Sequence, residues 1–507
     1  MGMESTRVKL ILLCMASFLV ATAVAWGVFE AVPHLEDEHA NYFQAKVFAA
    51  GRLTNPAPPV PEAFYVPFAV IQDGRKFSKY PPGYALVLAL GMLVRQPWLV
   101  NSLLAAVGIY ATYLLARDLY DQDTGLLAAA LGVVSPTYIM LSGTLLSNIS
   151  SLAALALFAW AFSRTRRESE ACRSLFALAA GGLIGWAFIS RPWSSVASGL
   201  PFAVLASSDV IRRPRQAFPV YAWMAAAFCF IAILLPAYTY AATGSPFTNL
   251  YRLWWPYDSV GFGPHTGRNG HTFQKAVINF RVDFPIFNQT ALGWPVWFGI
   301  PLTWLVASLA IALPPRRHQD WMLLAPPVAL IVAHLAYWAH SGGLYGVRYY
   351  SEALPFIWIV ASRGLLKLGT WTITRRAVQI ILPGCMIWGI ACQTAPRFQD
   401  GRGLYGITRA DSNLIINAGL KNALVIVDAP AWTDYGSLSW LNQIDLLDGE
   451  IIFARDRGPE ANARLVRQFS GRKVYYYSRH QEPRLILYQD HLEAMSLEPL
   501  SNIGSDD

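Results

Sequence analysis

The sequence predicts a polytopic α-helical membrane protein with a small extracytoplasmic α/β domain in its C-terminal part. Of the 507 residues, 54% are hydrophobic and only 14% are charged, which is too apolar for a soluble globule of this size. Apolar runs of about 20 residues, long enough to cross a bilayer, recur along the chain. The basic residues fall in short clusters between these runs, so the net charge of +8 indicates membrane topology and argues against nucleic acid as a partner.

About eleven spans, with the N-terminus inside and the C-terminal part outside, satisfy this charge pattern. Arg7 and Lys9 place the N-terminus inside. Because no small-residue cleavage site follows the first apolar run, we interpret it as an uncleaved span. The short run from Tyr84 to Val94 fits an interfacial or re-entrant helix. The spans are expected at residues 8–29, 98–116, 125–141, 149–163, 174–190, 195–209, 218–241, 291–313, 321–339, 353–366 and 377–393.

Two domains follow from this topology. Residues 1–395 form the transmembrane domain, with long outer loops at 30–80 and 243–290, and residues 396–507 form the soluble domain. In the soluble domain we expect strands at 423–427, 450–453, 473–477 and 484–488, and a helix at 459–469. This domain has no glycine-rich phosphate loop and no metal-spaced Cys/His set, so an accessory role, acceptor docking and plain packing stay open. If the domain is accessory, a chain ending near Gln399 should insert and keep some transfer to a simple acceptor.

An acidic cluster, Glu36-Asp37-Glu38, directly follows the first span. From Glu36 the sequence is typical of a short amphipathic helix on a bilayer surface, ending near Gly51. Acids in a first helical turn complement the helix dipole and need no further role. Charge at the edge of hydrocarbon is costly and usually functional, however, so we favour a functional site here.

The first outer loop also carries a series of short motifs, which are Asp37-Glu38, Tyr42, Phe43-Gln44-Ala45, Gly51-Arg52-Leu53-Thr54 and Lys79-Tyr80-Pro81-Pro82-Gly83-Tyr84. In these motifs it resembles the first loop of the GT-C superfamily of polyprenyl-phosphate-dependent glycosyltransferases. That superfamily includes protein mannosyltransferase-like (family 39-like) and aminoarabinose transferase-like members. The resemblance is strong over residues 30–160 and extends by topology to about residue 395, whereas the last hundred residues carry no matching motif.

The resemblance implies an enzyme of the bacterial inner (cell) membrane, multi-pass, with a cytoplasmic N-terminus and a periplasmic or extracellular C-terminal domain. It would transfer a hexosyl or pentosyl group, with inversion, from a polyprenyl-phosphate donor to a glycan, lipid or protein acceptor at the outer face. Asp37 would be the general base, since a carboxylate shielded at the membrane edge can have its pKa raised toward working pH. Glu38 would support it or bind a metal ion, and we interpret Glu36 as a surface charge.

Three cations are candidates for holding the donor phosphate. Arg348 comes first, because it occupies the place of the family's Arg-Tyr motif and a guanidinium binds phosphate oxygens bidentately. Lys79 and Arg191 come second, as lone cations in outer positions. A basic side chain that snorkels at the interface is the alternative explanation for all three.

Further residues of the outer loops are candidates for substrate contact. Aromatic side chains suit both sugar stacking and the interfacial aromatic belt, and the belt is the commoner explanation. His265 together with Asp37 and Glu38 could ligate a metal, although its spacing to His271 matches no compact ligand pattern. A divalent ion held by carboxylates alone stays open as a cofactor. The substrate-loop candidates are Tyr42, Tyr80, Tyr84, Trp255, His265, Arg268 and Tyr349.

One position departs from the family pattern. Many members carry an acid in the turn that here reads Ser147-Asn148, so a second carboxylate from this turn is missing.

Two other classes of protein are alternatives to a glycosyltransferase. A flippase or transporter for lipid-linked sugars would need ionisable groups in the middle of its spans, where this sequence has few. A family member that has lost catalysis and acts as a binding scaffold is the third possibility.

Overall fold

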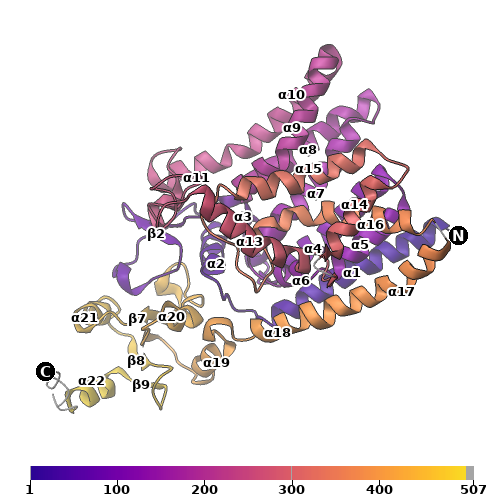
Figure 1. Cartoon of the computed structure of the whole chain (residues 1–507). Coiled ribbons are helices and arrows are strands. Elements are labelled where there is room, and N and C mark those ends of the chain that lie inside the picture. The colour runs from indigo at the N-terminus through magenta and orange to yellow at the C-terminus, as the bar shows by residue number, and fades with distance from the viewer. Residues whose placement is uncertain (1, 298–299, 371, 498–507) are drawn as a thin grey trace. The chain divides into compact units, whose positions relative to one another are not determined.

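The structure is a computed structural model that describes residues 2–297, 300–370 and 372–497 (Figure 1). The chain divides into two compact units. Unit 1 comprises Met1–Phe29 and Lys79–Arg402, and unit 2 comprises Glu30–Ser78 and Gly403–Asp507. The chain therefore passes between the units at three places, and each unit contains segments that are far apart in the sequence.

Unit 1 is almost entirely helical. A π-helix covers Gly389–Thr394 and a 3-10 helix (η2) covers Arg348–Ala353. The only paired strands described in this unit are the two-residue β4 (Val296–Trp297) and β5 (Ile300–Pro301). The α-helices are α1 (Gly2–Gly27), α3 (Pro82–Leu93), α4 (Leu99–Leu119), α5 (Gln122–Val133), α6 (Pro136–Ser142), α7 (Asn148–Thr165), α8 (Glu170–Ser190), α9 (Pro192–Arg212), α10 (Pro214–Ala232), α11 (Leu234–Thr243), α12 (Leu250–Trp254), α13 (Phe273–Thr290), α14 (Leu302–Ala312), α15 (His318–His334), α16 (Leu354–Leu368), α17 (Thr372–Trp388) and α18 (Ala395–Gly401).

Six helical segments of the described chain are long and apolar enough to cross a membrane. The bent pair α5–α6 would make a seventh, with an angle of 63° between its halves; Pro136 begins α6, where proline favours a helix start over continuation of α5. Helices also occupy the other expected spans, but they are shorter or less apolar. A polytopic helical fold is therefore confirmed, whereas the count of eleven stays a prediction.

The predicted span at 291–313 differs most from the structure. The helix α14 begins only at Leu302, and the residues before it include Gly293 in the left-handed region and the prolines 295 and 301. Such residues interrupt a helix. Conversely, α13 lies within the segment that we expected to be an outer loop, 243–290.

Burial separates the helices of unit 1 into inner and outer ones. Nearly every residue of α16 is buried, and its Trp358 packs edge-on to Tyr138 with ring centroids 5.1 Å apart. In contrast, α10 has no buried residue although it is strongly apolar. An exposed apolar helix is stable where its surroundings are lipid, so this contrast fits a membrane-embedded bundle.

Unit 2 is an α/β unit built on a four-stranded sheet. The strand order is β7-β6-β8-β9, with β6, β7 and β8 parallel and β9 antiparallel to β8. The strands and the helix predicted after residue 420 are all present within one or two residues. The elements are α2 (Glu36–Ala49), β1 (Asn55–Pro56), β2 (Ala69–Gln72), β3 (Arg75–Ser78), α19 (Arg409–Asn417), β6 (Ala423–Val427), α20 (Trp432–Ser439), β7 (Ile451–Arg455), α21 (Pro459–Gln468), β8 (Lys473–Tyr477), β9 (Leu485–Leu487) and α22 (Tyr488–Leu497).

The first outer loop completes the core of this sheet. Side chains alternate between the faces of a strand, so Leu424 and Ile426 of β6 lie on one face and Val425 and Val427 on the other. The first face packs with α21 and with residues 60–64 of the first loop, and the second with α19 and α20. Residues 30–78 therefore belong with the C-terminal residues, which differs from the division at 395/396 expected from the sequence.

Candidate active site

The acidic helix α2 begins with a capping arrangement that accounts for Glu38. Its Oε2 atom accepts hydrogen bonds from the backbone N–H groups of His34 (2.8 Å) and Leu35 (3.0 Å), and its side chain is 2% exposed. These are the donors that a helix N-terminus leaves without intrahelical partners. Helix capping therefore explains why an acid stands at this position.

Asp37 lies beside Glu38 in the same first turn but is only half-buried, as is Glu36. His39, in the next turn, is buried with its ring edge-on to Trp432 at 5.7 Å. Burial lowers the pKa of His39 to about 3, so this ring is neutral at neutral pH. Sequence reasoning had passed over this histidine.

Arg348 opens the helix η2 in unit 1, and an amide from another helix holds its backbone. Asn148 Nδ2 donates to the carbonyl oxygen of Arg348 (2.7 Å) and to Ser351 Oγ (3.0 Å). The guanidinium carbon lies 5.7 Å from the centroid of the Tyr349 ring. The Ser147-Asn148 turn, which departs from the family pattern, thus supports the segment that carries the main phosphate-binding candidate.

Arg191, between α8 and α9, has a buried carboxylate partner. Its Nε lies 2.7 Å from Oε1 of Glu352, whose side chain is fully buried. Sequence reasoning missed Glu352, although it stands at the start of an apolar helix where charge is costly. The structure therefore places Arg191 in an ion pair near the end of η2.

Lys79 also faces a buried acid that the sequence did not single out. Its Nζ lies 3.5 Å from Oδ2 of Asp258, and the two side chains are 2% and 3% exposed. Asp258 Oδ1 also accepts bonds from Trp338 Nε1 (3.1 Å) and the Tyr337 hydroxyl (3.3 Å). The second long loop is thus tied by Asp258 to the lysine of the Tyr-Pro-Pro-Gly motif.

Aromatic rings surround this lysine within unit 1. Its Nζ is 4.4 Å from the Trp255 ring centroid, 5.4 Å from that of Tyr80 and 5.6 Å from that of Tyr251. Such distances suit cation–π attraction. Two of the predicted substrate-loop aromatics, Tyr80 and Trp255, therefore gather around Lys79.

The other substrate-loop candidates are dispersed. Tyr349 stacks on His334 with centroids 5.5 Å apart, and Tyr84 is buried in α3. His265 and Arg268 are exposed in the second long loop. Tyr42 is buried in unit 2, edge-on to Trp440 at 6.0 Å.

Glu38 is poorly placed to be a metal ligand, because its Oε2 atom already accepts hydrogen bonds from two backbone N–H groups. His271 directs its Nε2 to the carbonyl oxygen of Leu335 at 2.9 Å. Within residues 2–297, 300–370 and 372–497, no group of three or more His, Cys, Asp or Glu side chains could hold a metal ion. We therefore derive no step through a metal, and a carboxylate-bound ion stays a prediction.

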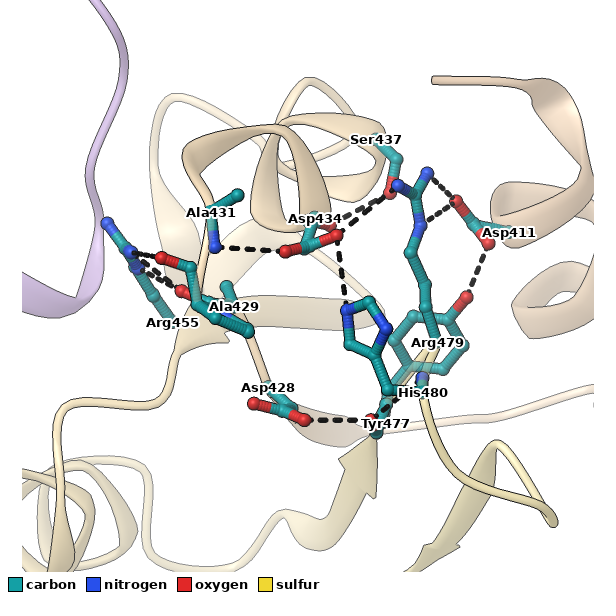
Figure 2. A network of polar contacts seen from close by, with 12 residues as sticks. Asp411, Asp428, Ala429, Ala431, Asp434, Ser437, Arg455, Tyr477, Arg479 and His480 are labelled. Atoms are coloured by element: carbon teal, nitrogen blue, oxygen red, sulfur yellow. Dashed lines mark hydrogen bonds and ion pairs between the residues drawn. The ribbon is translucent and has the colours of Figure 1, made fainter. Parts of the chain in front are cut away.

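A second polar cluster lies at the carboxyl end of β8 in unit 2 (Figure 2). Arg479 binds Asp411 through Nε at 2.7 Å and reaches Asp434 at 3.4 Å, while the Tyr477 hydroxyl donates to Asp411 at 2.5 Å. Asp434 in turn accepts the backbone N–H of Ala431, at the start of α20. The cluster ties α19 and α20 to the sheet, so its charges are explained by packing.

The resemblance to the GT-C superfamily of glycosyltransferases is confirmed by a family match within the chain and by the fold of solved structures. More particularly, residues 79–239 match the family described as dolichyl-phosphate-mannose-protein mannosyltransferase. A search of curated protein sequences found no match.

Solved structures of other proteins share the fold over nearly the whole chain. ArnT from Cupriavidus metallidurans bound to undecaprenyl phosphate aligns with a TM-score of 0.59, covering 98% of this chain and 96% of that chain at 12% identity. Its apo state aligns with a TM-score of 0.56 at 12% identity, covering 96% of this chain and 94% of that one. The Archaeoglobus fulgidus oligosaccharyltransferase in complex with Zn and sulfate aligns with a TM-score of 0.53 at 12% identity, covering 93% and 67%.

Proposed function

We propose that this protein is a membrane glycosyltransferase that moves a sugar from a polyprenyl-phosphate donor to an acceptor at the outer face of a bacterial cell membrane. The observation that carries the proposal is the family match over residues 79–239 on a chain with the GT-C fold. The related ArnT structure contains undecaprenyl phosphate, which supports a lipid phosphate as the leaving group here. The six long apolar helical segments of the described chain support a place in the membrane.

Asp37 is the proposed general base. The acceptor hydroxyl attacks the anomeric carbon, the bond from that carbon to the phosphate oxygen breaks, and the hydroxyl proton passes to the Asp37 carboxylate. One displacement inverts the anomeric centre and needs no glycosyl-enzyme intermediate. Of the three acids in the first turn, Glu38 caps the helix. Asp37 stands where the similar family carries its acidic residue in the first outer loop, so Asp37 is the acid that we assign to chemistry.

Arg348 is the proposed phosphate-binding residue, because its planar guanidinium can hold two phosphate oxygens as negative charge develops on the leaving group. Asn148 and Ser351 fix the backbone from which it projects. A donor phosphate would meet Lys79 and Arg191 as members of ion pairs with Asp258 and Glu352. We therefore assign these two residues a supporting part in donor binding.

The test is a transfer assay with the purified protein in liposomes and a radiolabelled polyprenyl-phosphate sugar. Asp37→Asn preserves shape and removes the proton acceptor, so we expect transfer to fall by about 10²–10⁴ while thermal stability is retained. Glu36→Gln, in the same turn, is the matched control and should leave transfer within a few-fold of wild type. Near-wild-type transfer by Asp37→Asn at saturating donor would overturn the assignment of the base. Movement of the donor across the bilayer without formation of a glycosidic product would contradict the proposal that the protein is a glycosyltransferase.

A further inference from the structure

Unit 2 contains a pocket of about 400 Å³ between the first outer loop and the C-terminal residues. One wall is formed by α2 and the proline-rich run 56–59, and the other by residues 439–448 with Phe469. All its lining residues belong to unit 2. The volume lies within the range of small-molecule sites, roughly 300–1,000 Å³.

Two lysines of this pocket are held by carbonyl oxygens and aromatic rings. Lys46 Nζ donates to the carbonyl oxygens of Trp440 (2.6 Å) and Asn442 (2.8 Å), and lies 5.0 Å from the Tyr42 ring centroid. Lys76 Nζ donates to the carbonyl oxygen of Phe64 (2.6 Å) and lies 5.0 Å from the Phe43 ring centroid. In the described part of the chain, neither amine has a carboxylate within 4.0 Å, although Lys76 is only 5% exposed.

The acids near the pocket do not neutralise these lysines. Asp445 is held by both terminal nitrogens of Arg52, at 2.7 and 2.8 Å, and is exposed. Asp448 is exposed as well. A buried ammonium without a carboxylate is costly, and an anion that enters the pocket would offset this cost. The titratable groups that line the pocket together with the two lysines are His39, Tyr42, Tyr435, Asp445 and Asp448.

Burial lowers the pKa of both Lys46 and Lys76 to about 7. Near neutral pH each amine of the empty pocket is therefore partly discharged. A bound anion stabilises the charged form, so binding above pH 7 should be accompanied by uptake of protons from solution.

We propose that this pocket binds an anionic saccharide unit, with a carboxylate or phosphate near Lys46 and Lys76 and the sugar ring against Tyr42, Trp440 and the proline run. The positive charge of the pocket points to an anion. Aromatic and proline faces suit the apolar face of a sugar. That the ligand is a saccharide rests on the proposed function: a glycosyltransferase needs an acceptor, and we take a charged acceptor glycan as the ligand of this pocket.

Binding is measured by titration calorimetry on the full-length protein in detergent, without lipid donor. The probes are 4-nitrophenyl β-glucuronide, glucose 6-phosphate, the neutral 4-nitrophenyl β-glucoside and inorganic phosphate. We expect at least one of the two anionic sugars to bind at least tenfold more tightly than the neutral glucoside and inorganic phosphate, and the stronger of the two identifies the anionic group. In buffers of different ionisation enthalpy at pH 8, binding should take up protons. If the glucuronide, glucose 6-phosphate and the neutral glucoside bind equally well, the pocket does not recognise an anionic group. If inorganic phosphate binds as tightly as the anionic sugars, the pocket does not recognise a saccharide.

Variants and labelling assign the binding to this pocket. Lys46→Met and Lys76→Met should each weaken binding at least tenfold, whereas Lys473→Met, at an exposed lysine of the same unit, should not. In wild type, the preferred anionic sugar should slow acetylation of Lys46 and Lys76 at least tenfold and leave Lys473 unaffected. Unprotected Lys46 and Lys76, or unchanged affinity in both variants, would overturn the proposal. Because no donor is present, this result is independent of the transfer assay on Asp37.

Discussion

A chain that ends at Arg402 should insert into the membrane but lose transfer activity, because the truncation removes one wall of the core that contains the first outer loop. Val60 and Phe64 are each 3% exposed in the structure and pack against Leu424, Ile426 and their neighbours. Truncation would return these two side chains to water. At about 1.5–3 kcal/mol for each fully buried side chain, the loss is about 3–6 kcal/mol.

Polar contacts add to this loss. Lys46 would lose its two carbonyl acceptors at Trp440 and Asn442, and Arg52 would lose Asp445. Because folded domains are stable by only about 5–15 kcal/mol, the segment 30–78 should not hold its structure alone. The sequence left the role of the C-terminal residues open, and an active truncated protein was the expectation only for an accessory domain, since no motif linked these residues to the acidic helix.

The assay compares the truncated and full-length proteins in liposomes, by transfer activity and by limited proteolysis within residues 50–78. Phe64→Asp in the full-length chain should reproduce both effects, since it buries a charge in the same core. Leu53→Asp is the matched control, because Leu53 lies in the same loop and is 52% exposed. A truncated protein that resists proteolysis in this segment and transfers sugar at a third of the full-length rate or more would refute the reasoning.

Three further outcomes follow from single contacts. Glu38→Gln should lower the free energy of unfolding by about 1 kcal/mol and keep the transfer rate within a few-fold of wild type. A hundredfold loss of transfer at unchanged stability would instead show that Glu38 takes part in the reaction. Asp258→Ala should cost about 3–5 kcal/mol by leaving the Lys79 ammonium buried without this carboxylate, and Lys79→Met combined with Asp258→Leu should cost less than the sum of the single changes; additive losses would argue against the pair. The pKa values of Lys46 and Lys76 are lowered from 10.5 to about 7 in the folded state, so the unfolded state binds more protons between these values and stability should rise with pH there, by at most about 1.4 kcal/mol per pH unit for each lysine. Pulse proteolysis in urea from pH 6 to 9 measures this rise, and unchanged stability across that range would contradict it.

Local pattern was enough to predict most elements. The apolar runs located the helices of unit 1, and short runs rich in β-branched, aliphatic or aromatic residues located β6, β7 and β8. The bend at Pro136 and the late start of α14 at Leu302 were missed, because a hydropathy run reports apolarity and not the turns inside it.

The candidate site was predictable only in part. Asp37, Arg348 and Lys79 stand in motifs, so the sequence singled them out. Their partners did not stand in motifs: Asp258 is far from Lys79 in the chain, and ion pairs across such distances leave no local signal. The cap formed by Glu38 was missed for a different reason, since Leu35 occupies the N-cap position where serine or threonine would mark a capping box.

The dependence of the proposed base on distant residues follows from the length of its helix. With 14 residues, α2 is at the limit below which an isolated helix is marginal in water. Its capping bonds from Glu38 order the first turn, but the helix as a whole is held by tertiary contacts. Within unit 2 these come from the C-terminal residues, through Lys46 on Trp440 and Tyr42 against the same ring. The C-terminal residues therefore position Asp37 without contacting the reacting groups. Substitution of Trp440 should lower the transfer rate because it changes the orientation of α2.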